Sequence, residues 1–182
     1  MENNENFEIC SACGGKCCNN LPGNAHPQDF GFDTMSEDQI REELTAMFKS
    51  GNWQIDWWEN YSTEEGNDGH KGIFIRPTTK KGRGSIYHGA WDREGCTFHS
   101  NKGCDLAFNQ RPFDCKELVP RKSKCLIPFT EEERHPKLVA IEKWWPYEDL
   151  ITQVASDLGE DGAPEHDPDD LFGGLFGMLS RF

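Results

Sequence analysis

The chain reads Cys10-Ser-Ala-Cys13-Gly-Gly-Lys-Cys17-Cys18 near its N-terminus, which places four sulfur atoms within nine residues. The glycines between the cysteine pairs let the backbone turn tightly, so all four thiols can point toward one centre. Two of the cysteines are adjacent, and a disulfide between neighbours in sequence is strained. The stretch therefore favours a metal ion or an iron-sulfur cluster, and we expect the rest of the chain to be organised around it.

A second group of cysteines lies in residues 96–125. Short loops that contain Gly and Pro separate its members, so we expect each sulfur to sit on a turn with free backbone N–H groups nearby. Such donors stabilise the charge of a thiolate or a sulfide. The candidate metal ligands are then all eight cysteines of the chain, namely Cys10, Cys13, Cys17, Cys18, Cys96, Cys104, Cys115 and Cys125.

Three interpretations of these cysteines compete. They can hold an iron-sulfur cluster, most simply a 4Fe-4S cluster with four cysteine ligands, or one or two zinc ions in tetrahedral all-cysteine sites. Disulfide bonds are the weakest interpretation, because the acidic, polar start of the chain (Met1 to Asn6) carries no secretory signal and predicts a reducing, cytoplasmic location. The spacing indicates metal binding but does not distinguish iron from zinc.

Composition limits the fold and the partners. The 182 residues suit one domain with appendages, while 35% hydrophobic residues and a mean hydropathy of -0.77 predict a loop-rich domain with a small core that needs a staple. A net charge of -13 argues against general nucleic-acid binding, which requires clustered Lys and Arg. A transmembrane segment requires a run of about 18 apolar residues. The chain contains no such run, so no transmembrane segment is predicted.

A helix is predicted over residues 37–49. Ser36 and Gln39 match a capping box, in which each side chain accepts a hydrogen bond from the other residue's backbone N–H. Its apolar face consists of Ile40, Leu44, Met47 and Phe48, and Gly51 ends the pattern. We expect this face to pack in the core.

Two strands are predicted after this helix. Apolar Trp53, Ile55 and Trp57 alternate with polar Gln54 and Asp56, which is typical of a strand. Residues 72–76 are the expected antiparallel partner, ending before a proline, and the polar residues 63–70 suit the connection. The basic, glycine-rich residues 78–85 are predicted to form a loop.

The second half contains one clear helix and one ambiguous one. Pro146 precedes an apolar stripe that ends at Gly159, which predicts a helix between them. Pro136 interrupts the other candidate, over residues 130–145. Trp144, Trp145 and Tyr147 at the junction are expected in the core, with an aromatic lid over the sulfur site as the alternative.

Taken together, these patterns predict a small, loop-rich, metal-stabilised α+β domain over residues 1–159, with a few helices and a short antiparallel strand pair. Residues 160–170 form an acidic linker. Residues 171–182 form a flexible apolar tail whose Leu171, Leu175, Met178 and Phe182 share one helical face. The tail is expected to pack on its own domain or to bind a protein partner.

The cysteine motifs resemble a known family. The pattern C-x-x-C-G-G-x-C-C and the later Arg111-Pro112-x-x-Cys115 are similar to the CxxCxxCC, or YkgJ-like, cysteine-cluster family, described as a zinc- or iron-chelating, iron-sulfur-cluster-containing domain. The likeness spans residues 10–120, with one extra residue before the Cys17–Cys18 pair and one between Cys104 and Arg111. It implies metal binding by the seven cysteines before Cys125.

Two further residues are candidates for the site. Arg111 can donate charge-assisted hydrogen bonds to cluster sulfur, or pair with Asp105 or Asp114 at the surface, and we expect the inward role. His99 lies between Cys96 and Cys104 and is the one histidine considered as a substitute ligand, although a loop histidine with satisfied hydrogen bonds is the expectation.

The function predicted from the sequence is metal binding. The chain is expected to be an accessory or partner-binding protein that uses its metal for structure, redox chemistry or sensing. The alternative is a cluster-dependent modifying enzyme, because the cysteine region of flagellin lysine N-methylases is similar. No catalytic residue can be nominated, since no general acid/base pair or nucleophile motif is visible.

Overall fold

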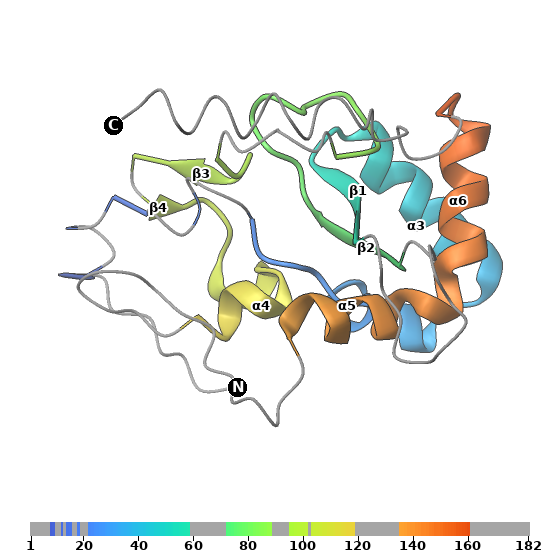
Figure 1. Cartoon of the computed structure of the whole chain (residues 1–182), viewed down its shortest axis with the longest axis horizontal. Helices are drawn as coiled ribbons and strands as arrows, with labels where there is room; N and C mark the ends of the chain where they lie inside the picture. Colours follow the sequence, from blue (N-terminus) through green and yellow to red (C-terminus); the bar gives the residue numbers. More distant parts are fainter. Residues whose placement is uncertain are drawn as a thin grey trace, which may run out of the picture.

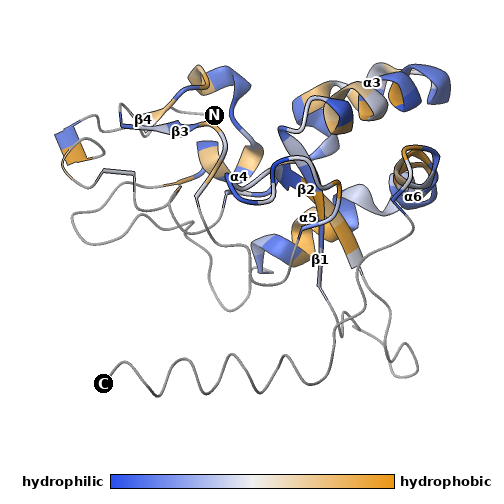
Figure 2. Ribbon diagram, turned by 90° about the horizontal axis from the view of Figure 1, so that it is seen from above, coloured by the Kyte–Doolittle hydropathy of each residue, from blue (hydrophilic) through white to orange (hydrophobic). Residues whose placement is uncertain are grey.

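The computed structural model describes residues 8, 9, 12, 14, 15, 18, 22–58, 72–88, 95–101, 103–118 and 135–160. Its helices and strands are, in order, η1 (Pro27–Phe30), η2 (Phe32–Thr34), α3 (Glu37–Lys49), β1 (Trp53–Trp58), β2 (Gly72–Pro77), β3 (His99–Ser100), β4 (Gly103–Cys104), η3 (Phe108–Gln110), α4 (Phe113–Lys116), α5 (Pro136–Trp144), η4 (Trp145–Tyr147) and α6 (Glu148–Asp157). The α+β class is confirmed. The β1–β2 pair lies between α3 and α6 at one end and β3 and β4 at the other (Figures 1 and 2).

Helix α3 has the predicted bounds because its signals are local. The backbone N–H of Ser36 donates to Gln39 Oε1 over 2.8 Å, and the N–H of Gln39 donates to Ser36 Oγ over 3.4 Å, which is the capping box. Gly51 follows the helix with a φ of 67°, a left-handed conformation that glycine adopts without strain. Polar and apolar residues alternate around the ribbon of α3 in Figure 2.

The predicted strands pair as expected, in an antiparallel hairpin with Ile55 opposite Ile75. Pro77 is the last residue of β2 instead of lying just beyond it. Chain segments also bond to both edges of the pair. The N–H of Ala25 donates to Ile75 O over 2.9 Å, and the N–H of Ile55 donates to Ile86 O over 2.7 Å. The hairpin is therefore covered along both edges, which leaves few backbone groups without partners.

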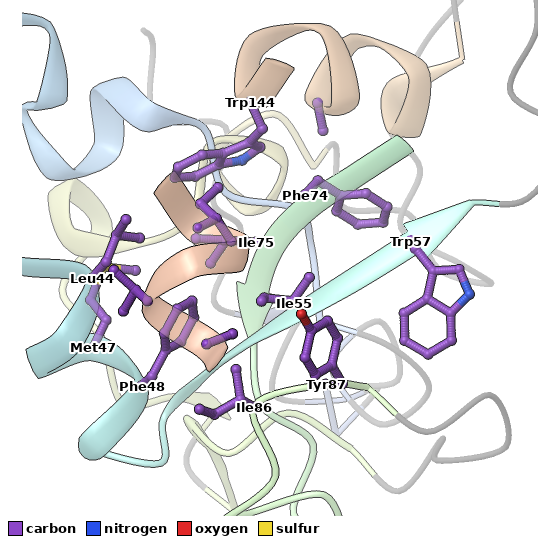
Figure 3. Close-up of a cluster of buried hydrophobic side chains, with 14 of the residues drawn as sticks. Leu44, Met47, Phe48, Ile55, Trp57, Phe74, Ile75, Ile86, Tyr87 and Trp144 are labelled. Atoms are coloured by element: carbon purple, nitrogen blue, oxygen red, sulfur yellow. The ribbon is translucent and has the colours of Figure 1, made fainter. Parts of the chain in front are cut away.

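The apolar core combines residues from helices and strands in both halves of the chain. Side chains from α3, both strands, α5 and α6 converge beside the hairpin (Figure 3). The buried members are Phe32, Ile40, Leu44, Met47, Phe48, Ile55, Trp57, Phe74, Ile75, Ile86, Tyr87, Ala140, Ile141, Trp144, Ile151, Val154 and Ala155. Among the described residues, Trp145 is the one large hydrophobic side chain that is exposed.

The aromatic junction before α6 divides between core and surface. Trp144 is fully buried, and its indole N–H donates to Ala25 O over 2.7 Å. Tyr147 is partly buried against the same core. Trp145 is 52% exposed, so placing it in the core was wrong. Trp144 packs edge-on to Phe32 within the core, and the alternative of a lid over the sulfur site does not fit its position.

Helix α5 begins where the sequence was ambiguous. Pro136 occupies its first turn, where the missing N–H costs no helical hydrogen bond. The helix packs closely on β2, and a Cβ at Gly72 would lie 2.5 Å from Cγ2 of Ile141. Helix α6 ends before Gly159, whose φ is 91°, as predicted.

One face of the hairpin is polar and yet buried. Gln54 and Arg76 are directly opposite each other, and Asp56 follows on the same face. Arg76 Nε lies 3.1 Å from Asp56 Oδ2, and Arg76 Nη2 donates to Asn24 Oδ1 over 2.9 Å. The chain segment that contains Asn24 covers these polar side chains. The ion pair and the hydrogen bond offset part of the cost of burying them.

Several predictions lie outside the described residues. They concern Cys10, Cys13, Cys17 and Cys125, the connection 63–70, the linker beyond residue 160 and the tail 171–182. Within the described part of the chain, no helix is both long enough and apolar enough to cross a membrane.

Candidate metal centre

The N-terminal cysteine stretch and the second cysteine group meet at the backbone. The N–H of Cys96 donates to the carbonyl of Cys18 over 2.6 Å. Cys96 is held in turn by the end of β2, because the N–H of Thr97 donates to Thr78 O over 2.9 Å and the N–H of Lys80 donates to Gly95 O over 2.9 Å. A continuous set of backbone hydrogen bonds therefore runs from the core hairpin to both cysteine groups.

Cys104 is positioned by the short β3–β4 hairpin. His99 and Cys104 are direct partners across this antiparallel pair, so their side chains stand on the same face. The turn is fixed by Ser100, whose hydroxyl donates to Asp105 Oδ1 over 2.7 Å. The N–H of Asp105 also donates to Phe98 O over 2.8 Å.

Cys115 is presented by the one-turn helix α4 and lies against Gly23. A Cβ at residue 23 would be 2.7 Å from Cys115 Sγ, so only glycine leaves room for this sulfur. Cys115 as a residue is partly exposed, whereas its sulfur is enclosed. Burial raises the pKa of the Cys115 thiol above its usual range, and the sulfurs of Cys96 and Cys104 raise it further, while a hydrogen bond from the backbone N–H of Gly23 lowers it.

The segment around Gly23 is clasped to α4 by polar contacts. Asn24 Nδ2 donates to Asp114 Oδ2 over 2.6 Å, and the N–H of Asp114 donates to Asn24 O over 3.2 Å. The carboxylate of Asp29 accepts from the N–H of Phe113 over 2.8 Å and from Lys116 Nζ over 2.7 Å. In Figure 1 this blue segment runs between α4 and β2. Cys115 is therefore tied to the core hairpin through residues 23–29.

Two titratable groups beside Cys115 are both shifted toward their neutral forms. Burial raises the pKa of Asp114 to about 6, against the hydrogen bonds from Asn24. Burial lowers the pKa of His26 to about 4, and its ring stacks on Phe113 at 4.2 Å. His26 Nε2 and Asp114 Oδ1 are 4.0 Å apart. Because burial disfavours both charges, His26 is neutral at pH 7 and the two groups form no charged pair.

His99 is not the satisfied loop histidine that the sequence predicted. Both ring nitrogens are buried, and neither has a hydrogen-bond partner in the described part of the chain. The Nε2 edge faces Gly15, where a Cβ would overlap the ring. Gly15 also accepts a hydrogen bond from the N–H of Cys18 over 2.8 Å. His99 thus lies between the two cysteine groups.

Arg111 packs locally at the entrance to α4. Its Nε donates to Leu106 O over 3.2 Å, and its guanidinium lies 5.8 Å from the ring centroid of Phe108. These contacts hold the loop between Cys104 and Cys115. Neither contact involves sulfur, so the predicted hydrogen bond from Arg111 to a cluster stays a prediction.

The structure brings Cys18, Cys96, Cys104 and Cys115 into one region, and Cys104 and Cys115 carry free thiols. Among the described residues alone, no three histidine, cysteine, aspartate or glutamate side chains are arranged to hold one metal ion. A thiolate at Cys115 nevertheless needs a neighbouring cation to offset its burial, and the ring nitrogens of His99 have no hydrogen-bond partner in the described part of the chain. The donor set therefore fits a soft, thiolate-binding metal.

Sequence reasoning missed the residues that build this region. Contacts between segments far apart in the chain involve Asn24, Asp114 and Asp29. The absence of a side chain at Gly15 and Gly23 lets the backbone approach His99 and Cys115 closely. The composition of the N-terminal loop offered one signal, since its two adjacent glycines precede a cysteine pair.

Comparisons of the chain with models of protein families, with curated proteins and with solved structures find no match.

Proposed function

We propose that this protein binds an iron-sulfur cluster or zinc through cysteines from both groups, and serves as an accessory protein in which the metal has a structural, redox or sensing role. The observation that carries the proposal is the backbone hydrogen bond between Cys18 and Cys96, which joins the two cysteine groups. The two cysteines are separated by 77 residues, and their contact brings the two groups close enough to share one metal centre.

The electrostatics at Cys115 support a cation in this region. Burial raises the pKa of the Cys115 thiol above its usual range, and the nearby sulfurs of Cys96 and Cys104 raise it further. Without a cation Cys115 stays a protonated thiol. A bound metal favours the deprotonated form, because thiols that bind a metal lose their protons and coordinate it as thiolates.

An iron-sulfur cluster is the preferred metal group and zinc is the alternative. Soft thiolates at short spacings, separated by small residues, are the ligands that such a cluster requires. When bound, such a cluster supplies one-electron redox chemistry, whereas zinc supplies structure. The free thiols of Cys104 and Cys115 accord with a reducing, cytoplasmic location.

A protein partner that binds the apolar segment 171–182 completes the proposal. That segment carries its apolar residues on one helical face, behind an acidic linker. Removal of residues 171–182 should release a co-purifying protein and leave the metal content of the remaining chain unchanged. Loss of metal in the truncated chain would contradict a role for the tail in partner binding alone.

Metal analysis of the full chain, purified without oxygen, tests the main proposal. We expect iron and acid-labile sulfide in equal amounts and a visible absorption that dithionite bleaches. Colourless protein with stoichiometric zinc would support the same metal site with zinc in place of the iron-sulfur cluster. Metal-free protein, or cysteines linked in pairs by disulfide bonds, would contradict the proposal.

A further inference from the structure

The imidazole of His99 occupies the junction of the two cysteine groups. It stands beside Cys104 across the β3–β4 pair, three residues beyond Cys96. The backbone N–H of His99 donates to Cys96 O over 3.0 Å, which fixes the backbone of the turn. The ring edge that carries Nε2 abuts Gly15 of the N-terminal stretch. One side chain thus contacts or neighbours residues from both cysteine groups.

The ring nitrogens of His99 have no hydrogen-bond partner among the described residues that would explain their burial. Each nitrogen exposes almost no surface to solvent, and neither has a hydrogen bond to any described residue. An unsatisfied buried nitrogen of this kind costs about 1–3 kcal/mol, and buried polar atoms are almost always paired. A ligand that accepts the lone pair of an imidazole nitrogen removes that cost.

A glycine at residue 15 makes this arrangement possible. Its φ of 67° is left-handed, and a Cβ there would lie 2.8 Å from Cδ2 of His99 and closer still to Nε2. The turn of the N-terminal stretch therefore approaches the imidazole more closely than any other residue type would permit. Close approach of this kind brings the cysteine loop within reach of the ring.

We propose that His99 supplies a nitrogen ligand to the metal centre, so that the centre has a mixed cysteine and histidine ligand set. This inference rests on the proposed function. Neutral imidazole is a common ligand of zinc and occurs in place of cysteine in some iron-sulfur centres. Because imidazole is neutral and thiolate is not, the nitrogen ligand removes one negative charge and raises the reduction potential of a cluster relative to an all-cysteine one.

Pulsed electron paramagnetic resonance on the intact protein tests the inference. The protein is produced with ¹⁵N-labelled histidine, purified without oxygen and reduced with dithionite. A histidine ligand gives a strong nitrogen coupling whose frequency changes with the isotope. If the native metal is zinc, Co²⁺ is the probe, and a His99→Cys variant should shift its visible bands to longer wavelength, because thiolate is the weaker-field ligand.

The matched control is His135, an exposed histidine at the start of α5. The labelled nitrogen coupling should be lost in His99→Ala and kept in His135→Ala. Metal-containing wild-type protein without any histidine coupling, or Co²⁺ bands that His99→Cys leaves in place, would overturn this inference and leave the proposed function standing. Wild-type protein without metal would overturn both. If His99→Ala fails to fold, His99→Cys, which keeps a metal-binding side chain, replaces it and should likewise lose the labelled nitrogen coupling.

Discussion

The backbone N–H of Cys96 lies 2.6 Å from the carbonyl oxygen of Cys18, and the two residues belong to cysteine groups that are far apart in the sequence. Because this bond sits at the end of the hydrogen-bonded path from β2, the position of both groups depends on the folded core hairpin. The cysteine region is an extension of the core, built on its edge, and does not replace it.

The first prediction concerns the cysteines of both groups. If both sulfurs bind the same metal centre, as we propose, Cys18→Ser and Cys115→Ser should each lower the metal content of the purified protein several-fold. Cys125→Ser distinguishes a ligand set of all eight cysteines, which predicts a similar loss of metal, from a set of the other seven, which predicts no loss. Metal measured per chain by native mass spectrometry gives the result. Independent loss of different metals from the Cys18 and Cys115 variants would argue for two separate sites.

The second prediction uses two glycines with ordinary backbone conformations. Gly23→Ala places a Cβ 2.7 Å from Cys115 Sγ, and Gly72→Ala places one 2.5 Å from Ile141 Cγ2. Overpacking of this kind costs about 1–3 kcal/mol of stability in each case. Only Gly23→Ala should also lower metal content. Urea unfolding and metal analysis, performed on both variants, test this. Equal metal content in the two would show that Cys115 is not a ligand.

The third prediction concerns the carboxylate that ties residues 26–29 to α4. Asp29→Ala removes acceptors for the N–H groups of His26 and Phe113 and for Lys116 Nζ. We expect the free energy of unfolding to fall by about 1–3 kcal/mol, because buried donors lose their partner. Asp33→Ala, on the neighbouring η2, is the control, since Asp33 is exposed. A similar loss in both variants would exclude a specific role for Asp29.

The fourth prediction is a pH dependence from His26. Burial lowers the pKa of His26 from 6.5 to about 4 in the folded protein, so the unfolded chain binds the proton first as pH falls. The contribution of neutral His26 to stability is therefore complete above pH 6.5 and is lost between pH 6.5 and about 4, by on the order of 3 kcal/mol. Asp114 acts in the opposite direction, because its raised pKa of about 6 makes the folded state bind the proton first.

His26→Phe isolates this effect, because a phenyl ring can keep the stack on Phe113 and cannot titrate. The stability of the variant relative to wild type should grow as pH falls from 6.5 to 4. Taking the difference between two proteins with the same cysteines cancels any acid-induced loss of metal that they share. Urea unfolding at several pH values measures it, and a constant difference would mean that His26 is accessible to protons in the folded state.

Local signals made much of the fold predictable. The bounds of α3 follow from Ser36, Gln39 and Gly51, and the end of α6 from Gly159, because caps and stops act within a few residues. The β1–β2 hairpin followed from alternation. Sequence reasoning did not foresee that the polar face with Gln54 and Arg76 is buried, because alternation marks two faces and does not say what covers each.

The sequence predicted cysteines from both groups as ligands, which stays a prediction, and it did not predict the framework that brings four of them into one region. Convergence of Cys96 and Cys115 was expected from residue type. The clasp between Asn24 and Asp114 joins residues 90 positions apart, and no local pattern encodes such a contact. The burial of the His99 ring likewise depends on Gly15, a residue from the other cysteine group.

X-ray absorption at the edge of the bound metal, on the full-length protein purified without oxygen, tests the central claim most directly. The account predicts a dominant shell of sulfur neighbours at about 2.3 Å that persists in His135→Ala and shrinks in Cys115→Ser. A shell made only of oxygen or nitrogen at about 2.0–2.2 Å, or sulfur neighbours that do not change in Cys115→Ser, would contradict it.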